Sequence, residues 1–299
     1  MRLTFWGTRG SIATPGKDTV RYGGNTPCTE VRLSNDDLII LDAGTGIRNL
    51  GEKLHKNGKA IKAFLLISHP HWDHIQGFPF FKPAFVKGNE ITIVGAETEK
   101  LNLQNMITDQ MNKIYFPLQM NDLEGKLNFL RVEEEKDLEV FGARIQTMYV
   151  NHPSFSLAYR ITQNGKTIVY ISDNEPFDAS LAARFRNVDQ GIVNKYLKSN
   201  GDPNQRIYDF VSGADVLIHD TTYTPEEYNN RQGWGHSHYL FTLKVAAMGK
   251  VKKLVLFHHD PSHGDDDVDR IFSKCQEEIN KRQYTFECVA AAEGMVLEA

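Results

Sequence analysis

The sequence has few cysteines, no long apolar run and no extended basic stretch. Its three cysteines, Cys28, Cys275 and Cys288, are far apart and odd in number, which argues against a disulfide framework and fits a reducing compartment. No window approaches eighteen uninterrupted apolar residues, and the first residues lack the apolar run and cleavage site of a signal peptide. We therefore expect a cytoplasmic chain without a membrane span.

The sequence also lacks a strong charge of one sign. Its 299 residues include 34 basic and 38 acidic side chains, which gives a net charge of −4. Without a basic stretch, the electrostatic surface that is typical of proteins binding duplex nucleic acid is missing. A small anion held at one site is compatible with this charge balance.

Apolar residues make up 40% of the chain and charged residues 24%, a composition that can bury a sizeable core. The length allows one or two domains, and we favour a single domain over residues 1–299. Short β-rich runs alternate with segments of helical spacing, which predicts interleaved strands and helices. The predicted strands include residues 3–6, 29–33, 37–41, 63–67, 90–94, 145–150, 156–161, 167–171, 215–218, 254–257 and 288–297, and the predicted helices 47–54, 97–111, 236–249 and 268–281.

These elements form two strand-rich blocks with helices between and after them, which predicts a layered α/β domain. Residues 178–209 interrupt the order and are typical of a helical insertion with a loop. This insertion is a plain surface helix pair, a substrate lid or a dimer contact.

Four side chains that bind metals lie within six residues at the end of a predicted buried strand. The motif is His69-Pro70-His71-Trp72-Asp73-His74, directly after the apolar run 63–67. In an extended segment His69 and His71 project to the same side, and a following turn into a helix would bring Asp73 and His74 toward the same space. Each pair could hold one metal ion, and the alternative is a solvated polar turn with incidental histidines.

Two metal sites need further ligands at the ends of other strands. The sequence has them in His152 after 145–150, Asp173 after 167–171, and His258-His259-Asp260 after 254–257. Any one of these alone could be a helix cap or a hydrogen-bonded loop residue. Their shared position after strands favours ligands.

The order Leu41-Asp42-Ala43-Gly44, then residues 69–74, His152, Asp173 and a late histidine resembles the metallo-β-lactamase superfamily over nearly the whole chain. Four further motifs are similar to its phosphodiesterase branch, which contains ribonuclease Z and PhnP-type cyclic phosphodiesterases: Tyr159-Arg160, Val169-Tyr170-Ile171-Ser172-Asp173, Leu217-Ile218-His219-Asp220 and Gly235-His236-Ser237. The resemblance implies an αββα sandwich of two mixed sheets flanked by helices. It also implies a homodimer and two divalent metal ions, with zinc as the first choice and manganese or iron as alternatives.

The resemblance also implies roles for single residues. His69, His71 and His152 would hold one metal, Asp73, His74 and the late histidine the other, and Asp173 would bridge them. Asp42 would support the site from behind by hydrogen bonding. The late ligand is His258 or His259, and the 22 residues from His236 to His258 match the interval usual in this branch, so we choose His258.

The resemblance makes His236 the proton donor that contacts the phosphate, a role that fits an imidazole titrating near neutral pH. Asp220 stands where ribonuclease Z usually has glutamate, and the shorter carboxylate could still orient His236. Asp73 would orient the attacking hydroxide. The alternative for His236 is a helix cap. The Gly-rich turns 7–11 and 23–26 either present backbone N–H groups to a phosphate or serve the fold alone.

The sequence departs from the ribonuclease Z pattern at one place that bears on the size of the substrate. Ribonuclease Z enzymes commonly carry a long arm that grips transfer RNA between the equivalents of His152 and Asp173, whereas only twenty residues separate them here. Without this arm and without a basic stretch, we predict a dinuclear metal-dependent phosphodiesterase for a small substrate, such as a cyclic nucleotide or a cyclic phosphate. Nucleic acid is the less favoured substrate, in a ribonuclease Z-like nuclease. A non-catalytic metal-binding sensor is the alternative from another class.

Overall fold

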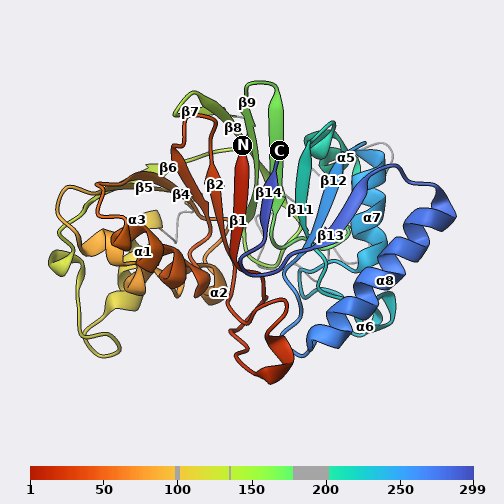
Figure 1. The fold of residues 1–299 in the computed structure, drawn as a ribbon, viewed down its shortest axis with the longest axis horizontal. Helices are drawn as coiled ribbons and strands as arrows, with labels where there is room; N and C mark the ends of the chain where they lie inside the picture. Colours follow the sequence, from red (N-terminus) through yellow and green to blue (C-terminus); the bar gives the residue numbers. More distant parts are fainter. Residues whose placement is uncertain (98–101, 135, 178–201) are drawn as a thin grey trace.

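The computed structural model describes residues 1–97, 102–134, 136–177 and 202–299. The described strands form two sheets that face each other, and helices cover both outer faces (Figure 1). This arrangement confirms the predicted αββα sandwich with two mixed sheets. No helix in these ranges is long and apolar enough to span a membrane.

The first sheet has the strand order β14-β1-β2-β3-β4-β5-β6. Neighbours from β14 to β3 pair antiparallel, and neighbours from β3 to β6 pair parallel. Its strands are β1 (Arg2–Gly7), β2 (Cys28–Arg32), β3 (Leu38–Leu41), β4 (Lys62–Leu66), β5 (Glu90–Gly95), β6 (Lys126–Arg131) and β14 (Val296–Glu298).

The second sheet has the order β13-β12-β11-β10-β9-β8-β7 and repeats this pattern. Neighbours from β7 to β10 pair antiparallel, and neighbours from β10 to β13 pair parallel. Its strands are β7 (Leu138–Val140), β8 (Ala143–Val150), β9 (Ser156–Gln163), β10 (Lys166–Ile171), β11 (Val216–Asp220), β12 (Lys253–Phe257) and β13 (Glu287–Ala290).

The helices divide between the two outer layers, with α1 and α3 beside the first sheet and α5, α7 and α8 beside the second (Figure 1). The described α-helices are α1 (Gly46–Lys56), α2 (Trp72–Ile75), α3 (Leu103–Thr108), α5 (Gln205–Val211), α6 (Pro225–Asn229), α7 (Tyr239–Met248) and α8 (Asp265–Arg282). Short 3-10 helices are η1 (Lys17–Thr19), η2 (Phe78–Phe80), η3 (Lys82–Phe85), η4 (Asp109–Met111) and η5 (Met120–Asp122).

The core has three layers, one between the sheets and one under each helical layer. Between the sheets, Phe5 packs against Phe257 with ring centroids 6.1 Å apart. The apolar spacing of α1 buries Ile47, Leu50 and Leu54 against the first sheet. Burial of apolar surface on this scale is the main stabilising contribution to such a fold.

The parallel strands at the centre of each sheet are buried on both faces, as their continuous apolar runs predict. Every residue of β3 and of β11 is buried. Because parallel strands end at the same edge of a sheet, the segments after β3, β4, β10, β11 and β12 emerge together. The candidate ligands lie in these segments, except His152, which follows β8, a strand that runs in the same direction as β10.

Some predicted boundaries are wrong. The strand expected over 288–297 is two strands in different sheets, β13 and β14, because the chain turns between them at Gly294 with a φ of +82°. The helix expected over 236–249 begins only at Tyr239, and the one expected over 97–111 is shorter, beginning after Asn102, whose side chain caps it. Of the predicted insertion 178–209, residues 178–201 lie outside the described residues and 205–211 form α5.

Candidate metal centre

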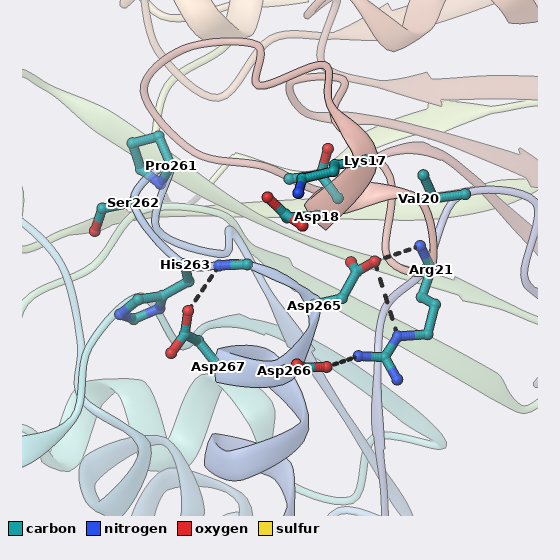
Figure 2. Close-up of a pocket in the computed structure, with 12 residues that line it drawn as sticks. Lys17, Asp18, Val20, Arg21, Pro261, Ser262, His263, Asp265, Asp266 and Asp267 are labelled. Atoms are coloured by element: carbon teal, nitrogen blue, oxygen red, sulfur yellow. Dashed lines mark hydrogen bonds and ion pairs between the residues drawn. The ribbon is translucent and has the colours of Figure 1, made fainter.

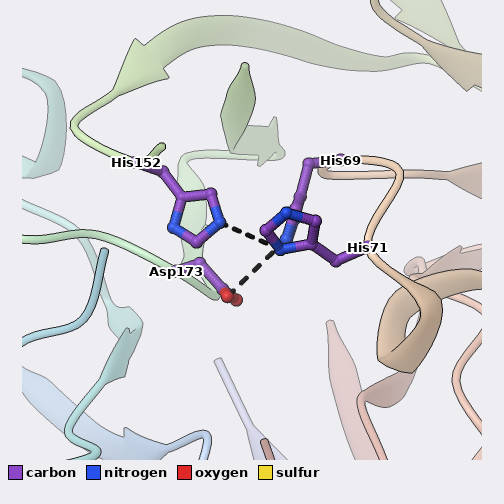
Figure 3. Close-up of side chains that lie close together, drawn as sticks. All are labelled: His69, His71, His152 and Asp173. Atoms are coloured by element: carbon purple, nitrogen blue, oxygen red, sulfur yellow. Dashed lines mark hydrogen bonds and ion pairs between the residues drawn. The ribbon is translucent and has the colours of Figure 1, made fainter. Parts of the chain in front are cut away.

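The first ligand group is made of three histidines and one aspartate from three different segments (Figure 3). His69 and His71 follow β4, His152 follows β8 and Asp173 follows β10. His152 Nε2 lies 3.1 Å from His71 Nδ1, and Asp173 Oδ2 lies 3.6 Å from His69 Nε2. The four candidate ligand atoms lie within 4.8 Å of one another.

The second ligand group joins Asp73 and His74 of α2 to His258, which follows β12. Asp73 Oδ2 lies 3.1 Å from His74 Nε2 and 3.3 Å from His258 Nε2. Asp173 Oδ1 lies 3.1 Å from His74 Nε2 and 3.4 Å from His258 Nε2. Asp173 therefore contacts both groups, which is the geometry that a bridging carboxylate requires.

Several polar atoms of the centre are buried without a hydrogen-bond partner among the described residues. They are His69 Nε2, His74 Nε2 and Asp173 Oδ1, whose close contacts within the cluster lack the alignment of a hydrogen bond. Such atoms are costly to bury unpaired, and each points into the cluster where a cation would be coordinated. Imidazole and carboxylate donors suit zinc, manganese and iron, so these residues fit two divalent cations.

The protonation of the cluster suits metal binding. Burial lowers the pKa of His152 to about 3 and that of His69 well below its ordinary value, so both imidazoles are neutral. Burial opposes ionisation of Asp73 and Asp173, but the neighbouring imidazoles hold the pKa of each carboxyl well below its ordinary value. His74 differs, because the surrounding carboxylates outweigh burial and raise its pKa, so it must release a proton to bind a metal.

Asp42 supports this cluster from the side away from the candidate metal positions. Its carboxylate accepts from the backbone N–H and hydroxyl of Ser68 at 2.7 and 2.8 Å and from the Tyr170 hydroxyl at 2.7 Å. Its Oδ2 also lies 2.8 Å from His74 Nδ1. This contact fixes the ring so that Nε2 faces the cluster. A second phenol, Tyr159, donates to the backbone oxygen of Ile67 at 2.6 Å and so joins the two sheets beneath the centre.

The two candidates for the late ligand lie in different places. His258 faces Asp73 and Asp173, with its backbone in the left-handed region at a φ of +60°. His259 instead pairs its Nε2 with the backbone oxygen of Ala291 at 2.9 Å. The geometry therefore favours His258.

His236 lies beside the centre, and its ring stacks on that of His258 with centroids 4.9 Å apart. Its Nδ1 lies 3.2 Å from Asp220 Oδ2. Burial lowers the pKa of His236, but the charge and hydrogen bond of Asp220 outweigh it and raise that pKa to about 9. The N-cap of α7 is His238, so His236 does not cap this helix.

Two contacts at the centre were not anticipated from the sequence. The backbone N–H of Ser11, in the Gly-rich turn 7–11, donates to Asp73 Oδ2 at 2.8 Å. Glu175 is fully buried and accepts from the backbone N–H groups of Gly233 and Gly235 at 2.7 and 2.9 Å. The Gly235 carbonyl in turn lies 3.0 Å from His152 Nδ1. The only sequence signal for Glu175 is its place two residues after Asp173.

A hollow of about 690 Å³ lies between residues 17–21 and the start of α8 (Figure 2). The three aspartates at the start of α8 are engaged within the fold. Asp265 accepts from the Arg21 backbone N–H at 2.8 Å, Asp266 pairs with the Arg21 guanidinium, and Asp267 accepts from the backbone N–H of the α8 N-cap. These contacts attach the loop after the first Gly-rich turn to α8.

The chain is similar to known proteins over almost its whole length. Ribonuclease Z from Thermoplasma acidophilum is 25% identical over 90% of this chain and 89% of its own length. Among solved structures, the metallo-beta-lactamase fold protein YhfI from Bacillus subtilis has a TM-score of 0.65 at 19% identity and 99% coverage of both chains. A diphosphatase from the PhnP family has a TM-score of 0.62 at 17% identity, covering 100% of this chain and 97% of its own. Residues 38–202 match the Beta-lactamase superfamily domain, and the chain belongs to that superfamily.

Proposed function

We propose that the chain is a dinuclear metal-dependent phosphodiesterase that hydrolyses a small phosphodiester, such as a cyclic nucleotide or a cyclic phosphate. The observation that carries this proposal is the pair of ligand groups that share Asp173, with His236 and Asp220 beside them. The similarity to proteins named ribonuclease Z and to a diphosphatase of the PhnP family supports chemistry at a phosphorus ester.

We assign each ligand to the cation that lies in its own contact group, and Asp173 to both. Divalent cations bound there would make an attacking water acidic and neutralise negative charge on a phosphoryl oxygen. Asp73 Oδ2 accepts from the Ser11 N–H, which holds this carboxylate in one orientation. The first cation would be held by His69, His71 and His152, the second by Asp73, His74 and His258, and both by Asp173.

His236 would act on the leaving group. Asp220 holds Nδ1 of the ring, so Nε2 is left to donate a proton, and a pKa of about 9 keeps His236 protonated at neutral pH. An alkoxide leaves poorly without a proton. A phosphodiester with an alcohol leaving group therefore needs this residue more than one with an acidic phenol.

The hairpin between β9 and β10 supports a small substrate. Its two central residues, Asn164 and Gly165, have φ of +51° and +73°, as a two-residue hairpin turn requires. The twenty residues between His152 and Asp173 are thus occupied by two paired strands and their connections, and they contain no arm that could grip a folded RNA. The net charge of −4 points the same way.

The proposal is tested by reconstituting the protein with zinc, manganese or iron and assaying bis(p-nitrophenyl) phosphate together with 2′,3′- and 3′,5′-cyclic nucleotides. We expect turnover of at least one cyclic substrate. No turnover of any of them, with turnover of a thioester or a lactam, would contradict the proposal. Sedimentation of the same preparation tests the predicted homodimer, and its metal analysis tests the preference for zinc.

Ribonuclease Z-like processing of RNA is the second candidate, favoured by the 25% identity to a protein of that name over 90% of the chain. A precursor transfer RNA cleavage assay decides between the two. Cleavage at rates well above those for cyclic nucleotides would favour the nuclease. A purified protein without bound metal and without activity after reconstitution would instead favour a non-catalytic binding module.

A further inference from the structure

A second hollow, of about 700 Å³, lies beside the metal centre and is formed by side chains with no part in the proposed chemistry. Its size is in the range of small-molecule sites. One wall belongs to the metal motif and α2, and the other to α3, η4 and the segment after them. The lining residues are Pro70, Trp72, Ile75, Gln76, Met106, Asp109, Gln110 and Tyr115.

The hollow borders the chain segment that carries the exposed ligand of the metal centre. In the first ligand group His71 is exposed, whereas His69, His152 and Asp173 are buried, so a substrate would approach past His71. The two residues that flank His71 in the chain, Pro70 and Trp72, both line the hollow. A group attached to a phosphate at the centre would have to pass the exposed His71 to reach the hollow.

The walls of the hollow carry two aromatic side chains that are unusually exposed to solvent. Trp72 is 78% exposed and Tyr115 is 82% exposed, although both are residue types that normally bury most of their surface. Ile114 beside Tyr115 is also exposed. A cluster of exposed apolar side chains next to a reactive centre is typical of a ligand site.

The polar groups of the hollow suit an uncharged ring with hydrogen-bonding edges. Gln76, Asp109 and Gln110 supply amide and carboxylate groups. The Gln110 amide nitrogen is buried and has no hydrogen-bond partner among the described residues. It could therefore donate to a ligand without losing an existing hydrogen bond of that nitrogen. Asp109 would repel a second phosphate, which disfavours a polynucleotide backbone in this position.

We propose that this hollow binds the nucleobase of a nucleotide phosphodiester, between Trp72 and Tyr115, while the phosphate lies at the metal centre. The inference rests on the proposed phosphodiesterase function. It specifies that the substrate of that activity carries a nucleobase. Stacking of a base on an aromatic side chain is favourable for every base because each has a π-face. The site would then select nucleotides over aliphatic phosphodiesters without requiring one particular base.

The test compares two cyclic phosphodiesters that differ by the base. Trp72→Ala and Tyr115→Ala are assayed on a 2′,3′-cyclic nucleotide and on glycerol 1,2-cyclic phosphate, which has no base. For each variant we expect KM for the nucleotide to rise about tenfold, the scale of one lost stacking contact. KM for the glycerol ester should change less than twofold. Trp72→Phe keeps an aromatic face and should restore the KM of the unmodified protein.

Met248→Ala is the matched control, because Met248 is an apolar side chain of α7 that is 53% exposed and lines none of these surfaces. It should leave both KM values unchanged. Circular dichroism of every variant shows whether it is folded. If Trp72→Ala does not fold, Tyr115→Ala and Trp72→Phe still carry the comparison.

A direct binding measurement separates this inference from the function on which it rests. Calorimetry of a nucleoside monophosphate and of ribose 5-phosphate should show tighter binding of the nucleotide, and Tyr115→Ala should abolish the difference. Equal binding of both ligands, or an equal rise of KM for both cyclic esters, would overturn the base site even if phosphodiesters are hydrolysed. If no phosphodiester is hydrolysed but the nucleotide preference is present and depends on Tyr115, the base site holds and the phosphodiesterase proposal fails.

Discussion

Two residues of the centre have a backbone conformation that side chains other than glycine seldom adopt. Asp42 has a φ of +58° and His258 a φ of +60°. Each such residue costs on the order of 1–2 kcal/mol, and each is kept in place by its side-chain contacts with the cluster. Strain retained at these two positions is consistent with a function that requires the side chains to meet.

Gly10 lies so close to His258 that any larger residue would displace the ring. A Cβ at this position would lie 2.3 Å from two atoms of the imidazole. We expect Gly10→Ala to displace the His258 ring and so to weaken metal binding at the second ligand group. Native mass spectrometry should then find about half of the total metal that the unmodified protein binds. Gly16→Ala in the same loop, where the nearest atom is 4.0 Å away, should keep full occupancy. Full occupancy in both variants would contradict the placement of His258.

His236 should matter in proportion to how poor the leaving group is. Removal of a general acid lowers the rate by about 10²- to 10⁴-fold when the leaving oxygen must be protonated. We therefore expect His236→Ala to lower kcat strongly for a cyclic nucleotide and much less for bis(p-nitrophenyl) phosphate, whose p-nitrophenolate leaves without a proton. Asp220→Asn should show the same asymmetry in weaker form. Equal losses on both substrates would exclude this role and indicate a structural one.

The pattern of histidine and aspartate after buried strands predicted the candidate ligands that the structure brings together, and the family resemblance added His236, Asp220 and Asp42. The sequence did not predict the Ser11 contact, since a backbone N–H leaves no trace in the residue type. Glu175 was also missed, because its partners are residues 228–235, more than fifty positions away. Contacts of this kind depend on how distant loops meet.

At the scale of elements, the loop from α6 to α7 is held from within by one carboxylate. Glu175 accepts from the Tyr228 hydroxyl at 2.9 Å and from two backbone N–H groups of the loop. The loop then presents the Gly235 carbonyl to His152 and carries His236. Glu175 thus supports the loop that contacts His152, and Asp220 orients the ring of His236 on the same loop.

Glu175→Gln tests this arrangement with little change of shape. The amide has one accepting oxygen in place of two, so at least one buried N–H group should lose its partner, at a cost of about 1–3 kcal/mol in the free energy of unfolding. We expect a lower midpoint in urea and weaker metal binding at the first ligand group. An exposed counterpart, Glu226→Gln at the start of α6, should change neither quantity. Unchanged stability of Glu175→Gln would show that the carboxylate does not hold the loop.

The order of strands and helices was largely predictable, because alternating runs and buried apolar runs follow from the periods of the two structures. The exception at 288–297 has a physical cause. The apolar residues on either side of Glu293-Gly294 do not reveal that they belong to different sheets, with Ala290 on β13 beside β12 and Val296 on β14 beside β1. Only the packing of both sheets makes the chain turn between them.

At the scale of the whole molecule, the centre lies on the seam between two halves of like topology. His69, His71, Asp73 and His74 come from the half that contains the first sheet, and His152, Asp173, His236 and His258 from the half that contains the second. A cation bound by both groups would therefore join the halves.

Metal removal should accordingly destabilise the whole fold rather than one loop. A ligand that binds only the folded state adds about 4 kcal/mol of stability at a free concentration 1,000 times its Kd. We expect dipicolinate or EDTA to lower the thermal midpoint in a single transition, and zinc to restore it. The measurement is scanning calorimetry at fixed protein concentration. A midpoint that does not respond to chelation or to added metal would contradict a metal centre on the seam.

The two phenols beneath the centre extend this idea into the interior of the protein. Tyr159 and Tyr170 both belong to the second sheet, and their hydroxyls reach Ile67 and Asp42 of the first half at 2.6 and 2.7 Å. These hydrogen bonds tie the two halves together beneath the centre, where each half contributes ligands to both groups. We therefore expect a substitution of either phenol to act on the centre from inside the sandwich, without any contact with a substrate.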